Sequence, residues 1–165
     1  MTRIFKSAGI DMTQNISPCS HFSWSSSARL EDIVRSKYLH FEIKCLHPGK
    51  FSCPYHFHRN AEEIFVVMDG EATLRTSDGY FKVAKGDILF FDEGQGGAHQ
   101  LYNHGDVDCR YLDIRTDANV DVCEYPDSGK INILPAIEVF NAATTVPYYS
   151  GEENVVSHWP EDILK

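Results

Sequence analysis

Two histidines, His56 and His58, stand two positions apart in a stretch rich in aromatic and apolar residues. On a β-strand, successive side chains alternate between the two faces of the sheet. Both imidazoles would therefore point the same way, about 6.6 Å apart along the strand. On a helix, side chains that share a face are three or four positions apart. The spacing thus predicts a strand that presents two nitrogen ligands to one site.

Glu63 follows after a break at Arg59-Asn60-Ala61, on the next predicted strand. By alternation it shares a face with Phe65 and Val67. A carboxylate on an apolar, inward face is costly unless it is paired or bound to a metal, and a divalent cation would remove that cost. Glu62 is the alternative ligand, because a register shift of one residue would exchange the two faces of the strand.

His99 lies on a later predicted strand, after a glycine-rich loop at 93–97. His56, His58, Glu63 and His99 would together hold one divalent metal ion, and such a donor set suits Fe, Mn, Ni or Zn. Six-coordinate Fe, Mn or Ni would keep two positions for water or substrate. Four-coordinate Zn would keep none, which would make the site structural.

The chain around these residues has β patterns that are bounded by turn residues. Turns are expected at His47-Pro48-Gly49, Asp69-Gly70, Ser77-Asp78-Gly79 and Lys85-Gly86-Asp87. The predicted strands are 38–46, 51–57, 62–68, 71–76, 80–83, 88–91, 98–103 and 109–115. Short strands at this spacing, with no alternating helices, predict an all-β sandwich or barrel.

We expect residues 38–116 to form this barrel. Residues 1–37 are rich in serine and poorly periodic, so they predict an irregular arm. One short helix is expected at 28–37, where apolar residues recur at helical spacing. Residues 117–165, with one more strand at 130–134, predict an extension packed on the barrel, because the segment is too short to build its own core.

The four residues lie in a sequence frame that resembles the two motifs of the cupin superfamily. The first motif is Gly49-x6-His56-x-His58-x4-Glu63-x6-Gly70, and the second runs from Gly86 through Asp92-x-Gly94 to His99-x3-Asn103. Two features depart from the family pattern. Asp92 stands where a proline is usual, and the glycine-rich loop before His99 is longer than the common one.

The resemblance implies a cupin double-stranded β-helix, a jelly-roll barrel, with irregular N- and C-terminal extensions. It also implies that the four residues coordinate the metal. The segment 122–130, with Tyr125-Pro126-Asp127, is similar to the tail of an uncharacterised group of single-domain bacterial cupins. This likeness supports the placement in the family and indicates no substrate.

The formal net charge is −9, which argues against binding to nucleic acid or to an anionic membrane surface. There is no apolar run of about 20 residues, and the N-terminus lacks the apolar stretch of a signal peptide. We therefore expect a cytoplasmic protein. The five cysteines form no Cys-x-x-Cys pair and are expected to be free thiols, with a ligand or redox role for Cys53 as the alternative.

The expected function is that of a metal-dependent enzyme acting on a small polar molecule, of the dioxygenase, decarboxylase or isomerase type. A non-catalytic module that binds a metal or a small molecule is the alternative. Tyr111 and Asp113 would line the pocket if their face of the strand points inward; with the opposite parity, Arg110, Leu112 and Ile114 would. A homodimer is expected, in which strand edges or the N-terminal arm pair between chains.

Overall fold

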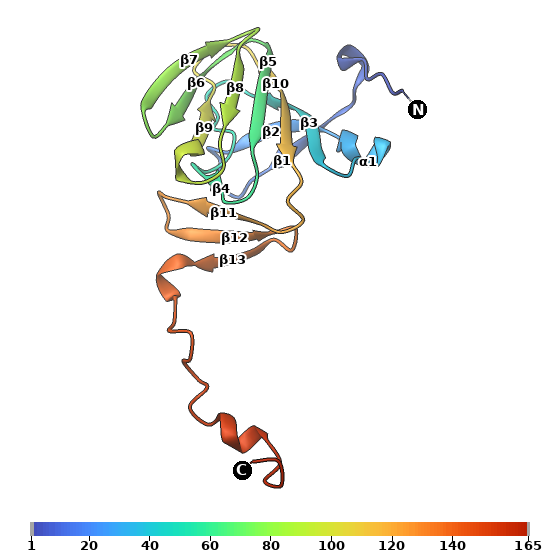
Figure 1. Ribbon diagram of the computed structural model, residues 1–165. Coiled ribbons are helices and arrows are strands. Elements are labelled where there is room, and N and C mark those ends of the chain that lie inside the picture. The colour runs from blue at the N-terminus through green and yellow to red at the C-terminus, as the bar shows by residue number, and fades with distance from the viewer. Residues whose placement is uncertain (1, 165) are drawn as a thin grey trace.

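The computed structural model describes residues 2–164 and shows a chain built mainly of antiparallel β-sheets (Figure 1). A six-stranded sheet has the order β1-β2-β3-β10-β5-β8, and a three-stranded sheet has the order β7-β6-β9. The strands of these two sheets are β1 (Met12–Ile16), β2 (Ser23–Ser27), β3 (Leu39–Leu46), β5 (Glu63–Asp69), β6 (Glu71–Thr76), β7 (Gly79–Ala84), β8 (Ile88–Phe91), β9 (His99–Tyr102) and β10 (Cys109–Thr116). The all-β fold predicted from the sequence is confirmed.

One apolar core joins the two sheets. Phe65 and Val67 of the six-stranded sheet belong to the same buried cluster as Ala72, Leu74 and Leu101 of the three-stranded sheet. The inner faces of the two sheets therefore pack against each other. Alternation along each strand supplies this core, because every second side chain points inward.

The same alternation carries polar side chains into the interior. On β5, Glu63 is buried on the same face as Phe65 and Val67. On β10, Tyr111 and Asp113 are buried, and the intervening residues are half-buried on the other face. The sequence did not decide which face of β10 points inward, and the structure places Tyr111 and Asp113 on the inner face.

The predicted strand at 51–57 is mostly absent. Only β4 (Phe57–His58) is a strand, and Phe51 and His56 form isolated bridges. Pro54 has no backbone N–H to donate, which disfavours a regular ladder. Side chains hold the segment instead: Ser52 accepts a hydrogen bond from the Leu101 N–H, and Gln100 donates one to the Cys53 carbonyl.

The N-terminal segment is more regular than expected. Strands β1 and β2 form a hairpin, and β2 pairs with β3, so the arm extends the six-stranded sheet of its own chain. Within the predicted helical segment, α1 (Leu30–Val34) forms one short helix that ends at Arg35, whose φ is +54°. The expectation of an irregular arm is therefore wrong. Tertiary pairing with β3 orders a serine-rich sequence that has little β signal of its own.

The C-terminal segment adds a third sheet, with the order β13-β12-β11-β4. Its strands are β11 (Asp121–Tyr125), β12 (Lys130–Leu134) and β13 (Glu138–Asn141), and β11 pairs with β4 next to the barrel. Residues 145–164 are exposed and run away from the barrel (Figure 1). The expected packing of the whole segment on the barrel is thus limited to its first part.

The remaining short elements are 3-10 helices: η1 (Ser7–Gly9), η2 (Gln95–Gly97), η3 (Ala142–Thr144) and η4 (Val155–His158). Within residues 2–164, no helix has the length and apolar character needed to cross a membrane.

Candidate metal centre

The four residues predicted as ligands come together, and all are buried. The exposed fraction is 9% for His56, 4% for His58, 6% for Glu63 and 1% for His99. His56 and His99 form a backbone bridge, in which each N–H donates to the carbonyl of the other residue. Glu62 is exposed, so the register of β5 places Glu63 inside rather than its neighbour.

Each of the three imidazoles is oriented by a hydrogen bond from Nδ1. The pairs are His56 with the Pro54 carbonyl (3.0 Å), His58 with the Asp121 carboxylate (2.5 Å) and His99 with the Gly97 carbonyl (2.8 Å). Carbonyl and carboxylate oxygens only accept, so Nδ1 carries the hydrogen in each ring. This arrangement leaves Nε2 as the ligand atom, as in many metal-binding histidines.

The Nε2 atoms converge on one carboxylate oxygen. Glu63 Oε2 lies 3.1 Å from His99 Nε2 and 3.5 Å from His58 Nε2. The ligand atoms of His56, Glu63 and His99 all lie within 4.8 Å of one another. Among residues 2–164, Glu63 Oε2 and His99 Nε2 are buried without a hydrogen-bond partner. Such orphaned atoms are costly, and a divalent cation would satisfy both, so the residues fit a metal ion.

Burial and charge set the protonation of these groups. Burial lowers the pKa of His56 to about 4, against the opposing effect of Glu63. Burial would also lower the pKa of His58, but hydrogen bonds to Asp121, Cys123 and Glu63 outweigh it and raise that pKa to about 11. Burial would raise the pKa of Glu63, yet His58 and His99 hold it well below its usual range. The carboxylate is therefore an anion in an apolar interior.

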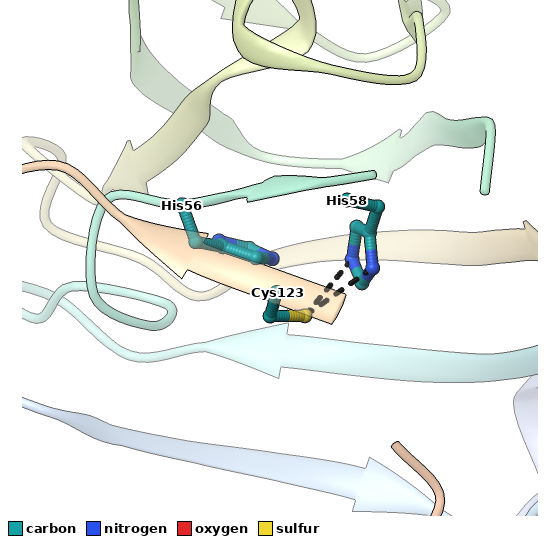
Figure 2. Close-up of side chains that lie close together, drawn as sticks. All are labelled: His56, His58 and Cys123. Carbon is teal, nitrogen blue, oxygen red and sulfur yellow. Dashed lines mark hydrogen bonds between the residues drawn. The ribbon is translucent and has the colours of Figure 1, made fainter. Parts of the chain in front are cut away.

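Cys123 is a further side chain at the site, which the sequence analysis did not identify. Its Sγ lies 3.3 Å from His58 Nδ1 and 3.8 Å from His58 Nε2. Figure 2 shows the thiol beside the His58 ring, and the His56 ring lies near both. Asp121 and Cys123 are the buried residues of β11, so alternation over 121–125 was the signal that could have identified both.

Cys53 lies beside His56, with its Sγ 3.5 Å from His56 Nδ1. All five cysteines are free, as expected.

Aromatic rings enclose the imidazoles. Phe91 stacks on His99 with ring centroids 3.7 Å apart, and Phe65 meets the same ring edge-on at 5.3 Å. Tyr125 stacks beside His56 at 5.9 Å. These contacts restrict the rotamers of His56 and His99 and keep the site in a low-dielectric setting, where electrostatic interactions are strong.

The glycine-rich loop before His99 is held by close backbone contacts. Gly94 has a φ of +79°, which glycine adopts readily, and its N–H donates to the His58 carbonyl at 2.6 Å. A Cβ on Gly97 would lie 1.8 Å from the Asp92 carbonyl oxygen. The loop therefore fixes the entry of the chain into β9, where His99 is the first residue.

Lys44 and Asp113 form an ion pair beside the site, with Nζ and Oδ2 2.6 Å apart. Lys44 lies on β3, opposite β10 in the same sheet. Burial raises the pKa of Asp113, and Lys44 opposes that shift. Burial also raises the pKa of Tyr111 well above its usual range. Lys44 did not stand out in the sequence, because only the pairing of β3 with β10 brings it here.

A cavity of about 180 Å³ opens beside His56, His58 and Glu63. Lys44, Tyr111, Arg115, Tyr125 and Asn132 also line it, and the Asn132 Oδ1 is buried without a hydrogen-bond partner among the described residues. The cavity therefore combines the ligand cluster with polar groups suited to a small polar molecule.

Comparisons with known proteins agree with this fold. Residues 43–115 match the family model of the cupin domain. This region of the chain is therefore similar to the cupin domain, and the double-stranded β-helix fold expected from the sequence motifs is confirmed. No protein of curated function matched the chain.

Solved structures share the fold at low sequence identity. A structure from Acidithiobacillus ferrooxidans ATCC 23270, provisionally named a sugar phosphate isomerase, is 22% identical with a TM-score of 0.77; the match covers 87% of this chain and 95% of that one. A sugar phosphate isomerase of the cupin superfamily from Silicibacter pomeroyi DSS-3 is 19% identical with a TM-score of 0.75, over 90% and 98% of the two chains. The polyketide cyclase RemF from Streptomyces resistomycificus is 16% identical with a TM-score of 0.59, over 98% and 96%.

The close packing at Gly97 gives a first prediction. Gly97→Ala should lower the free energy of unfolding by about 1–3 kcal/mol or more, because the new methyl group would collide with the Asp92 carbonyl. Gly96→Ala is the matched control, since nothing lies within 4 Å of its added Cβ. Denaturant unfolding of both variants measures the difference. Equal stabilities would mean that the loop is not held by this contact.

Proposed function

We propose that this protein is a metal-dependent enzyme that acts on a small polar molecule. His56, His58, Glu63 and His99 would hold one divalent ion. The observation that carries the proposal is the convergence of imidazole Nε2 atoms on the Glu63 carboxylate, with buried ligand atoms that have no protein partner. Three imidazoles and one carboxylate favour Fe, Mn, Ni or Zn over Mg or Ca.

The residues around the four ligands support catalysis over purely structural metal binding. When bound, the ion would supply Lewis acidity toward an oxygen of the substrate. Lys44 and Asp113 lie in the same region as Glu63, because all three line a neighbouring cavity. Their ammonium and carboxylate groups would orient the substrate and exchange a proton with it. They are the acid–base pair that the sequence alone did not reveal.

Among reaction types, we favour proton transfer next to a carbonyl or hydroxyl group, as in an isomerase. Isomerisation by proton transfer needs a positioned acid–base group, and the Lys44–Asp113 pair would supply one. Two structures of similar fold carry sugar phosphate isomerase names, which is consistent with this choice. Both are under 25% identical to this chain, so the proposal depends on its own side chains.

A non-catalytic module remains the second candidate function. The approach of Cys123 to His58 favours it, because a thiolate among the ligands would complete a four-coordinate zinc site with no open position. The metal content and the turnover of the purified chain distinguish the two.

The ligand set predicts the response of metal content to mutation. His56→Ala and His99→Ala should each lose most of the bound metal while the barrel stays folded, since both rings sit on backbone held by sheet pairing. His158→Ala, on the exposed η4, is the matched control. Metal analysis and circular dichroism provide the readouts. Release is also expected as the pH falls, because an imidazole nitrogen must be unprotonated to bind the ion. Full occupancy of both variants would disprove the assignment.

The acid–base pair gives a separate prediction. In protein loaded with Fe, Mn, Ni or Zn, Lys44→Met and Asp113→Asn should lower kcat about 10²- to 10⁴-fold with unchanged metal content. Turnover would be screened on aldose–ketose pairs and hydroxy acids, with Lys82→Met on the exposed face of β7 as the control. Tight ligand binding without turnover in the unmodified protein would support the non-catalytic module instead.

A further inference from the structure

Two arginines near the candidate metal centre have no partner. A second cavity, of about 210 Å³, lies next to the first and shares Lys44, Glu63 and Arg115 with it. Arg29 and His40 also line this second cavity. Within residues 2–164, neither Arg29 nor Arg115 forms an ion pair or a side-chain hydrogen bond, although the cavity contains four carboxylates.

The carboxylates of this cavity have partners other than the two arginines. Glu31 accepts from the Phe41 N–H at 3.0 Å and lies 3.3 Å from His40. Glu42 and Asp113 both face Lys44. The fourth carboxylate, Glu63, belongs to the histidine cluster. Arg29 and Arg115 are therefore the cationic groups of this cavity that no carboxylate among residues 2–164 engages.

We infer that Arg29 and Arg115 bind an oxyanion group of the substrate, a phosphate or a carboxylate, while its reacting end faces Glu63 and the Lys44–Asp113 pair. This inference rests on the proposed function, because it names the substrate class of the same site. Guanidinium groups bind such oxyanions through two parallel hydrogen bonds, which fixes orientation as well as position.

The fold explains why the two arginines meet here. Arg115 lies on β10, directly opposite Glu63 of β5 in the sheet. Arg29 precedes α1 and comes from the N-terminal segment, and Leu134 of β12 closes the same cavity from the C-terminal side. Arg29, Arg115 and Leu134 also line a third cavity of about 250 Å³, which gives room for the rest of an anionic molecule. Both extensions thus contribute to the substrate site.

The test measures binding of inorganic phosphate and of succinate by isothermal titration calorimetry at matched ionic strength. Arg29→Gln and Arg115→Gln should each weaken binding about 10-fold or more, and the double variant should bind neither anion. Arg3→Gln, outside these cavities, should bind as the unmodified protein does. Binding by phosphate alone, succinate alone or both would support the inference and identify the source of the oxyanion.

The outcomes separate this inference from the metal assignment. Anion binding would be measured on both metal-loaded and metal-stripped protein. The metal content of the His56→Ala and His99→Ala variants tests the metal assignment separately. Binding that is absent in the unmodified protein, or equally strong in Arg29→Gln and Arg115→Gln, would overturn the arginine site while leaving the metal assignment intact.

Discussion

The burial of one carboxylate sets the main constraint on this structure. Glu63 is 6% exposed and shares its face of β5 with Phe65 and Val67, yet its pKa is held well below the usual range. An ionised carboxylate in an apolar interior is stable only if positive charge or hydrogen bonds compensate it. The histidine cluster provides that compensation, and the arrangement of the surrounding segments follows from the need to keep the imidazoles in place.

The barrel orients the imidazoles mainly through backbone carbonyl groups. Two of the three imidazoles are anchored by carbonyls close to them in sequence, at Pro54 and Gly97, and the third by Asp121 from a distant strand. The irregular segment before β4 and the glycine-rich loop before β9 are therefore part of the ligand geometry. Departures from regular strand structure occur where the site needs a carbonyl to point at a ring, since a strand carbonyl would be used by its neighbour.

The segments outside the barrel contribute residues to the site. Strand β11 brings Asp121 and Cys123 to His58, and the N-terminal segment brings Arg29 to the second cavity. A cupin barrel is a scaffold that supports many chemistries, so the reaction depends on what such additions place around the ligands. In this chain they place Asp121 and Cys123 beside His58, and Arg29 at a cavity that Glu63 also lines.

The sequence by itself determined the all-β class, most barrel strands and the grouping of His56, His58, Glu63 and His99. The fold class and the strands follow from local alternation and turn residues, which depend only on neighbours along the chain. The grouping of the four residues rests on the resemblance to the two cupin motifs. Tertiary structure decided the rest. Whether Glu63 or Glu62 faces inward, and whether Tyr111 and Asp113 do, depends on register, which is set between strands. The hairpin β1–β2, and the approach of Lys44, Arg29 and Cys123, arise from pairing between segments far apart in sequence, which no local pattern encodes.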